Sequence, residues 1–401
     1  MKLKSFITLA SVLVSNFAFA QTSHSPATPS FAISGFATVA AHGLTNTTGG
    51  GTNAPVIVRT VKEFQSAAER LDLKDKKLRD NSPRVILIAT NLDLGELANV
   101  TGNSTGKSVG IIRVRPHTTI YATGDGATIR RGTLEIHGAW NIIIRNLRFR
   151  DLWEFDPTGA YDRLGWDYVR ITNAGEIFSH HIWVDHCDFG KVYDGQCDIV
   201  HGSDCITVSW CRFAGDERGP QKKSMLIGHS SNASNLERDG GRLNVSLHHN
   251  WYENIDDRSP RARIGNIHCW NNLIEGAQYA TISVTKCVTL VENCFYRDAL
   301  IATTFSHAKD SVARENAGTI CIVGSKNENP RPLPAVTKPD EKLEQENNFK
   351  SNVAREKLQF NPPADFKWDN RNELPYRYTA DPVDAVPALV KQFAGTGKLG
   401  L

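Results

Sequence analysis

Three aspartates are the residues of this 401-residue chain whose spacing first points to chemistry. Asp194 and Asp198 lie four residues apart, and Asp167 lies in a strand-like stretch one repeat upstream. Residues four apart on an extended strand are separated by ~13 Å, so both carboxylates can reach one calcium ion, at ~2.3–2.6 Å, only if the chain bends between them. Gly195 gives the backbone the freedom to bend there. The competing interpretation is a surface loop with two solvated aspartates.

A basic cluster follows the acidic one. Lys223 comes first, and Arg258, Arg261 and Arg263 lie close together further along the chain. Alternate residues of a strand share a face, so Arg261 and Arg263 are expected to point the same way, whereas Pro260 holds Arg258 in a separate bend. A solvated basic loop would also explain the arginines alone.

The order of the two clusters favours a shared binding site. Carboxylates on two successive repeats are followed by basic residues on the next two, which in a solenoid places both clusters on one flank. A divalent cation beside arginine and lysine suits an acidic sugar polymer, because a uronate carboxylate can bridge to the ion while a guanidinium binds it through two hydrogen bonds.

Histidines are numerous, and a metal-binding or triad role has to be weighed for them. The strand histidines occupy positions that are apolar or asparagine in other repeats, which indicates core or turn residues. They are His180, His181, His186, His248 and His249. The glycines at 49–51 lack the Gly-Lys-Ser/Thr ending of a phosphate-binding loop, so no nucleotide is expected.

The elements that must position these residues are short β-branched runs that repeat from about residue 85 onward. Runs such as 142–149, 182–189 and 206–213 align with one another, and the alignment places equivalent residues in one column: Leu147, Cys187, Cys211, Asn250, Asn272 and Cys294. The last two steps of this column are 22 residues each. One strand-like run per repeat of this length is typical of a solenoid, and asparagines stacked at a bend can bond both backbone and each other.

The repeats therefore predict an all-β fold, a parallel β-helix in which each coil buries its apolar side against its neighbours. An antiparallel sandwich is the alternative, but the two-residue Asn-Gly or Asp-Gly hairpins that it needs do not recur between the runs.

Segments before and after the repeats are expected to cover the coils. Thr60 caps a short amphipathic helix near the N-terminus. We place the core coils at about 80–325 and a proline-rich C-terminal packing segment at about 326–401, with a short helix from Val386 to Phe393. Residues 21–401 then form a single domain.

The chain begins with a pattern typical of a secretory signal peptide. Residues 1–20 contain a charged start, an apolar run over 6–14 and small residues before Gln21. No later segment of ~20 apolar residues follows, so we expect a secreted protein, extracellular or periplasmic, that has no membrane contact after signal cleavage. The net charge of +3 is too small to indicate nucleic acid as a partner.

The eight cysteines all lie between Cys187 and Cys321. Export to an oxidising compartment allows up to four disulfide bonds. The alternative is that the cysteines are buried free thiols stacked in the core. If Cys187 and Cys211 lie on adjacent coils, they are close enough either to form a bridge or to stack.

Four motifs in order give the chain a resemblance to a known family. They are Trp-Val-Asp-His at 183–186, Asp-Gly-x-x-Asp at 194–198, Leu-Ile-Gly after Lys223 and Arg-x-Pro-x-x-Arg at 258–263. In these residues the chain resembles the pectate lyase family from about Gly35 to the C-terminus. The resemblance implies a right-handed parallel β-helix with three parallel sheets and a long groove beside one of them.

The resemblance also implies an activity. The protein is expected to be a secreted, endo-acting lyase that cleaves α-1,4-linked polygalacturonate by calcium-assisted β-elimination and releases 4,5-unsaturated oligogalacturonides. We expect the protein itself to be a monomer. The residue roles that the resemblance implies are calcium binding by Asp167, Asp194 and Asp198, proton abstraction from carbon-5 by Arg258, and binding of substrate carboxylates by Lys223 and Arg263.

Departures from the family pattern leave one role open. The run before Lys223 lacks the usual His-Asp pair, so Lys222 is an alternative to Lys223, and Ser259 and Ala262 replace residues that are more often alanine and valine. Two other functions stay as alternatives: a calcium-independent pectin lyase for methyl-esterified polymer, and a non-catalytic β-helical polysaccharide-binding protein. A hydrolase would need paired acid and base carboxylates, which are not found outside the expected calcium site.

Overall fold

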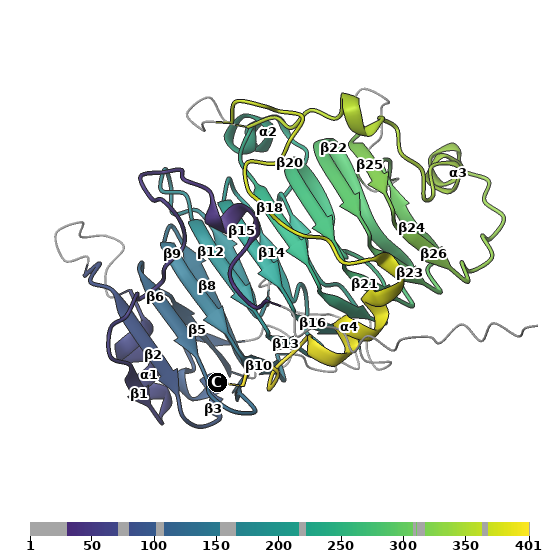
Figure 1. Cartoon of the computed structure of the whole chain (residues 1–401). Helices are drawn as coiled ribbons and strands as arrows, with labels where there is room; N and C mark the ends of the chain where they lie inside the picture. Colours follow the sequence, from purple (N-terminus) through teal and green to yellow (C-terminus); the bar gives the residue numbers. More distant parts are fainter. Residues whose placement is uncertain are drawn as a thin grey trace, which may run out of the picture. The chain divides into compact units, whose positions relative to one another are not determined.

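The repeated β-branched runs form parallel strands that stack coil upon coil (Figure 1). In the computed structural model, equivalent residues of successive runs pair in register. The paired residues five positions before the column inferred from the sequence are Ile142, Ile182, Ile206, Val245, Ile267 and Thr289, so the alignment is the one expected. The structure describes residues 30–70, 80–101, 108–152, 166–215, 222–307, 310, 317–362 and 368–400. The expected signal peptide at 1–20 lies outside this part of the chain.

Three parallel ladders make up the coils, which confirms the predicted parallel β-helix. The first sheet contains β5 (Ser108–Arg113), β8 (Gly132–His137), β11 (Val169–Thr172), β14 (Cys197–Ile199), β17 (Leu226–Ile227), the first parts of β20 (Arg261–Trp270) and β22 (Tyr279–Glu292), and β24 (Ile301–Thr304). β4 (Val100–Thr101) pairs antiparallel with β5.

The second sheet contains β1 (Val56–Val58), β2 (Arg84–Ile88), β6 (Thr118–Tyr121), β9 (Trp140–Arg145), β12 (His180–Asp185), β15 (Asp204–Ser209), β18 (Asn244–His248), the later parts of β20 and β22, and β25 (Thr319–Val323). Because β20 and β22 continue from the first sheet into the second, hydrogen bonds join these two sheets.

The third sheet contains β3 (Leu92–Asp93), β7 (Ala127–Arg130), β10 (Leu147–Arg150), β13 (Asp188–Phe189), β16 (Arg212–Ala214), β19 (Trp251–Glu253), β21 (Leu273–Glu275), β23 (Phe295–Arg297) and β26 (Lys326–Glu328). Inside it, Phe149, Phe189, Phe213 and Tyr252 stack with ring centroids 4.9 Å apart. This is the spacing of adjacent strands, so each coil places its ring on the ring of the next coil.

One left-handed residue turns each coil from the second sheet into the third. Asn146, His186, Trp210, His249, Asn271 and Asn293 all occupy this position, with φ between 46° and 58°. The asparagine column directly after the bend is bonded as expected: Asn250 Nδ2 donates to Asn272 Oδ1 at 3.1 Å and to the Val208 carbonyl at 2.9 Å.

All eight cysteines are free and buried, so the predicted disulfide bonds are wrong and the alternative of buried thiols is right. Cys187 and Cys211 do lie on adjacent coils, but they stack. The backbone N–H of Cys187 donates to Cys211 Sγ at 3.4 Å, and each thiol donates to a carbonyl of its own coil at 3.3 Å. Burial raises the pKa of Cys211 well above its usual value, which favours the thiol over the thiolate that forms a bridge.

Thiol titration measures this arrangement directly. The native protein is expected to react negligibly with a thiol reagent, and the denatured protein is expected to show all eight cysteines as free thiols. A reducing agent is expected to leave the melting temperature unchanged. Fewer reactive thiols after denaturation without reductant would show that bridges had formed.

The terminal segments pack on the coils. Thr60 caps α1 (Val61–Ala68) through a capping box with Glu63, as expected from the sequence. The predicted helix at the C-terminus is α4 (Val386–Phe393), which lies beside the third sheet (Figure 1). Its Val386 and Val390 pack with Leu273 and Phe295 of that sheet. The remaining helical elements are α2 (Ala233–Asp239), α3 (Pro339–Glu346), η1 (Gly35–Thr38), η3 (Leu94–Leu97), η6 (Arg355–Lys357) and η7 (Val383–Ala385).

The N-terminal segment with η1 lies on the second sheet. The backbone N–H of Phe36 donates to Ser246 Oγ at 2.9 Å, and that of Ala37 donates to Thr207 Oγ1 at 3.1 Å. Residues 32–401 group into one compact unit. No helix in the described ranges has the length and apolar character needed to cross a membrane.

Candidate active site

A cleft of about 540 Å³ runs along the outer face of the first sheet. Register places its residues side by side: Arg170 pairs with Asp198, Ile199 with Ile227, and Leu226 with Arg261. Five of the six residues expected at the site line this cleft: Asp167, Asp194, Asp198, Arg258 and Arg263. The sixth, Lys223, places its Nζ 4.0 Å from Asp194 Oδ1. The coils thus bring together residues spread over almost a hundred positions of the sequence.

The acidic cluster is built around Gly195. Its backbone N–H donates to Asp167 Oδ1 at 2.8 Å, while Asp198 Oδ1 accepts a hydrogen bond from the Leu226 N–H at 2.9 Å. A Cβ at position 195 would lie 2.2 Å from Asp198 Oδ1 and 2.9 Å from Asp167 Oδ1. Glycine is therefore required here because the backbone passes so close to two carboxylates, a reason different from the flexibility expected from the sequence.

Gly195→Ala is expected to weaken calcium binding by about 10- to 100-fold, because the new methyl group must push the Asp198 and Asp167 carboxylates out of place. Isothermal titration with calcium measures the change. Gly240→Ala is a suitable control, since a Cβ there approaches nothing closer than 3.0 Å. Equal calcium affinity in both variants would contradict the role given to Gly195.

Burial and mutual repulsion disfavour the charged forms of two aspartates. Asp167 and Asp198 are buried, whereas the Asp194 side chain is about one-third exposed. The pKa of Asp167 is raised by burial and by the charges of Asp198 and Asp194. Burial raises the pKa of Asp198 to about 6, against the opposing effect of Arg258. A cation among these carboxylates would relieve both effects.

The three carboxylates do not converge as closely as a shared ion requires. Among the described residues, the group of three whose ligand atoms all lie within 4.8 Å of one another is elsewhere, at His42, Asp204 and Cys205. Asp194 has room to move, because its side chain is about one-third exposed. Shared coordination of a cation would therefore need the carboxylates to move closer together, and Asp194 is the most exposed of the three.

Arg258 lies between two of the aspartates. Its Nη1 is 3.4 Å from Asp194 Oδ1 and 3.5 Å from Asp198 Oδ2, and its side chain is 14% exposed. Burial acts to lower the pKa of Arg258, but the charges of Asp198 and Asp194 outweigh it and raise the pKa. The neutral guanidine expected for a base therefore requires that the charges of these carboxylates be offset.

The backbone at Arg258 has φ of 72°, so the side chain leaves the chain at a left-handed bend rather than from a regular strand. The buried Nε of Arg258 has no hydrogen-bond partner among the described residues. The separate bend that Pro260 predicted is thus present, and it directs Arg258 to the aspartates while β20 begins only at Arg261.

Lys223 and Lys222 occupy different environments. The carbonyl of Lys222 accepts the backbone N–H groups of Asp256 and Asp257, while Lys223 forms a β-bridge with Asp257 and directs its Nζ to Asp194. This geometry favours Lys223 over Lys222 as the lysine of the site.

Arg261 and Arg263 share the outer face of β20 as expected, with Ala262 buried between them. Arg263 Nε donates to Asp310 Oδ1 at 2.5 Å, and its Nη1 donates to the carbonyls of Gly228 and His229. Arg261 Nη2 contacts Asp257 at 2.6 Å and His307 at 2.9 Å. Arg263 lines the cleft and Arg261 supports it from the side.

Some residues of the cleft were not assigned a role from the sequence. Arg170 and Glu135 lie in register with Asp198 and form an ion pair with each other. His201 and His229 also line the cleft. Strand alternation in the sequence could have predicted the position of Arg170. It follows Val169, whose side chain is buried, so the Arg170 side chain points to the outer face of the sheet, where the cleft lies. Burial, with Arg238 nearby, lowers the pKa of His201 to about 4, so this imidazole is neutral at ordinary pH.

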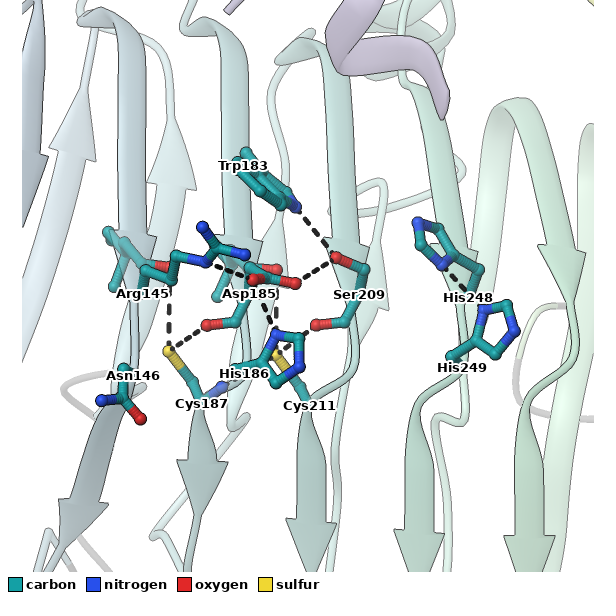
Figure 2. A network of polar contacts seen from close by, with 12 residues as sticks. Arg145, Asn146, Trp183, Asp185, His186, Cys187, Ser209, Cys211, His248 and His249 are labelled. Atoms are coloured by element: carbon teal, nitrogen blue, oxygen red, sulfur yellow. Dashed lines mark hydrogen bonds and ion pairs between the residues drawn. The ribbon is translucent and has the colours of Figure 1, made fainter. Parts of the chain in front are cut away.

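The Trp-Val-Asp-His motif does not reach the cleft. It lies in β12 of the second sheet, where the fully buried Asp185 accepts hydrogen bonds from Arg145 Nε at 2.6 Å, His186 Nδ1 at 2.7 Å and Ser209 Oγ at 2.6 Å (Figure 2). The aspartate lies between serine and histidine, which is not the order in which a histidine activates a serine nucleophile. The hydrogen bonds of this network connect the three successive coils that contain Arg145, Asp185 and Ser209.

His186 and His249 occupy the left-handed bends described above, and His248 is buried beside His249 with their Nδ1 atoms 3.0 Å apart (Figure 2). Burial lowers the pKa of His248 well below the usual value. These positions confirm that His186, His248 and His249 are core or turn residues.

The stacked coils and the cleft with acidic and basic walls define a class of polysaccharide-processing β-helix enzymes. Residues 6–399 match the family model described as pectate lyase, and the chain therefore belongs to the pectate lyase family and is a polysaccharide lyase. The family, the fold and the enzyme class predicted from the motifs are confirmed.

Individual relatives agree with this assignment. The chain is 30% identical over 292 residues to pectate lyase B of Paenibacillus amylolyticus, covering 57% of this chain and 71% of that protein. It is 41% identical over 163 residues to the pectate trisaccharide-lyase of Thermotoga maritima, covering 40% of each. In fold it is similar to a pectate lyase from Paenibacillus sp., with a TM-score of 0.68, 22% identity and coverage of 92% and 96%.

Proposed function

We propose that this chain is a secreted, endo-acting pectate lyase that cleaves α-1,4-linked polygalacturonate by calcium-assisted β-elimination. The observation that carries the proposal is the position of Arg258, with its guanidinium 3.4–3.5 Å from the carboxylates of Asp194 and Asp198 in a cleft that Asp167 also lines. A similar structure, that of a Bacillus sp. pectate lyase, is a complex with trigalacturonate, which supports the same class of substrate here.

Calcium would be held by Asp167, Asp194 and Asp198, because this ion takes carboxylate oxygens as ligands. The residues fit such an ion: two of the carboxylates are buried beside Gly195, and their pKa values are raised first by burial and then by the neighbouring negative charges, which a divalent cation offsets. When bound, calcium would polarise the uronate carboxylate and make the carbon-5 proton more acidic.

The basic residues would abstract the proton and bind the substrate. Arg258 takes the carbon-5 proton, the electrons of that C–H bond form the double bond between carbon-4 and carbon-5, and the glycosidic oxygen leaves carbon-4 with the bonding electrons and takes a proton from water. Lys223 and Arg263 bind the uronate carboxylates and stabilise the charge that develops as the proton leaves. Ion pairs with Asp194 and Asp198 hold the guanidinium of Arg258 in the lining of the cleft.

An absorbance assay tests the proposal. Purified protein is incubated with polygalacturonate, with calcium and then with chelator, while the unsaturated product is followed in the near ultraviolet. We expect product with calcium and none with chelator. Equal rates in both would remove the metal from the mechanism, product on methyl-esterified pectin alone would indicate a pectin lyase, and no product on any pectin would indicate a binding protein.

Two finer parts of the proposal have their own measurements. Endo action predicts a broad range of oligogalacturonides early in the reaction, whereas exo action would give one short product from the start. Export predicts a mature N-terminus near Gln21 in the protein recovered outside the cell. Light scattering on that protein tests the expected monomer.

A further inference from the structure

A second cluster of metal-ligating side chains lies on the second sheet. His42, Asp204 and Cys205 each offer one ligand atom, and these atoms all lie within 4.8 Å of one another. His42 Nε2 is 2.7 Å from Asp204 Oδ2. None of the three lines the cleft of the first sheet, so the proposed lyase chemistry does not account for them.

The backbone of β15 brings Asp204 and Cys205 to the same place. Successive strand residues normally point to opposite faces of a sheet. Cys205 has φ of 53°, a left-handed conformation that interrupts this alternation at the start of the strand. Both residues are fully buried. His42 reaches them from the N-terminal segment, 162 residues away in the sequence.

Asp204 is oriented by a neighbouring asparagine. Its Oδ1 accepts hydrogen bonds from the backbone N–H of Asn244 at 2.9 Å and from Asn244 Nδ2 at 2.7 Å, while Oδ2 faces His42. Hydrogen bonds of this kind fix the carboxylates that bind metals in proteins. The buried aspartate is therefore held with one oxygen directed into the cluster.

A further histidine, His180, lies beside the cluster, outside the set of side chains whose ligand atoms lie within 4.8 Å of one another. His180 is in register with Asp204, and its ring centroid is 4.8 Å from that of His42. His181 Nε2 is 2.9 Å from the Val39 carbonyl, which can only accept, so His181 Nε2 donates and its Nδ1 carries a lone pair. His180 Nδ1, at 2.9 Å from His181 Nδ1, must then be the donor, which leaves the lone pair of His180 on Nε2.

The neutral state of His180 suits a metal ligand. Its Nδ1 is used as the donor to His181, so Nε2 keeps a lone pair. A neutral imidazole with a lone pair on Nε2 is the form in which histidine binds metals.

We propose that His42, Asp204 and Cys205 form a binding site for a thiophilic divalent transition metal, with Zn²⁺ as the best-matched ion and His180 Nε2 as a fourth ligand. Imidazole, carboxylate and thiolate together suit zinc, whereas calcium takes oxygen ligands alone. Zinc at roughly 2.0–2.3 Å from each atom needs ligand atoms about 3.5 Å apart, which modest side-chain closure within the present cluster provides.

The site would act as a structural clamp. Binding displaces the proton shared by His42 and Asp204 and the thiol proton of Cys205, so uptake releases protons and strengthens as pH rises. Because His42 belongs to the N-terminal segment, Asp204 and Cys205 to β15 and His180 to β12, the ion would tie that segment to two coils. Metal binding of this kind stabilises the folded state by mass action.

Cobalt and zinc binding to the full-length, untagged protein test the proposal. We expect Co²⁺ to produce a thiolate-to-cobalt charge-transfer band, zinc to remain bound at one ion per chain after dialysis, and zinc to raise the melting temperature by several degrees. Excess calcium is expected to leave the cobalt band unchanged. Absence of the band and of retained zinc in the wild-type protein would overturn the site.

Variants assign the ligands. Cys205→Ser and His42→Gln are expected to lose the band and the retained zinc, and glutamine at 42 keeps a donor to Asp204 so that the fold is preserved. Cys321→Ser is the control, because Cys321 lies in the same buried apolar cluster as Cys205. Binding by Cys205→Ser equal to that of the control would overturn the proposal. Calcium-dependent lyase activity is expected in all three variants, which separates this test from that of the proposed function.

Discussion

Arg258→Lys is expected to lower turnover on polygalacturonate by about 10²- to 10⁴-fold, the contribution typical of a positioned general base. A lysine ammonium keeps the positive charge, but it is shorter and cannot hold the position of Nη1, which is 3.4 Å from Asp194 Oδ1 and 3.5 Å from Asp198 Oδ2. The initial rate of unsaturated product at saturating substrate measures the loss.

Two further measurements separate catalysis from assembly of the site. Calcium affinity is expected to be retained in Arg258→Lys, because the three aspartates and Gly195 are unchanged. Arg263→Lys provides the matched comparison: its guanidinium contacts Asp310 and two carbonyls, and its loss is expected to raise KM more than it lowers kcat. An Arg258→Lys protein with a near-normal rate would remove Arg258 from proton abstraction.

The pH dependence of the wild-type enzyme follows from the same contacts. Asp198 and Asp194 raise the pKa of Arg258, so the fraction of neutral guanidine is small near neutral pH and grows only as pH rises. We accordingly expect the rate to increase into the alkaline range.

The column of equivalent positions made the fold predictable. Once Leu147, Cys187, Cys211 and Asn250 were aligned, the register of the runs from 142 to 296 followed, because in-register stacking buries the same face of each coil. The sequence gives little sign of the elbows within β20 and β22, where two sheets continue through one strand. Ile264, Thr285 and Lys286 at these bends have left-handed φ although they are not glycine, and Gly265 marks the bend in β20 alone.

Export to an oxidising compartment was not enough to predict disulfide bonds between the cysteines. Export permits bridges, but the inward positions of Cys187 and Cys211 place both thiols in the stack of small core residues, where each donates to a carbonyl of its own coil. A bridge requires facing Cβ vectors, whereas stacking keeps equivalent vectors parallel. Spacing along the chain does not distinguish these two cases.

The site was predictable where residue type alone decides chemistry, and less so where backbone geometry decides it. Acidic and basic residues on successive coils gave the members of the cleft. The close approach of Gly195 to two carboxylates, and the choice of Lys223 over Lys222, depend on atomic positions that a single sequence does not contain.

Asp198→Asn is expected to change activity and stability in opposite directions. Loss of a calcium ligand should weaken calcium binding by at least about 10²-fold and reduce activity accordingly. In chelator at pH 7, however, the variant should be more stable than the wild-type protein by up to about 3 kcal/mol. The reason is that burial raises the pKa of Asp198 from 3.8 to about 6, and each unit corresponds to about 1.4 kcal/mol.

The sign of this effect depends on pH. A carboxyl whose pKa is higher in the folded state than in the unfolded state costs stability as pH rises from about 4 to about 6, and the cost then stays constant. Urea unfolding in chelator should therefore give equal stabilities for the two proteins near pH 4 and a gap at pH 7. Saturating calcium should reverse the gap, because only the wild-type site binds the ion tightly. A variant less stable than wild type at pH 7 without calcium would show that the attraction of Asp198 to Arg258 exceeds the cost of its burial.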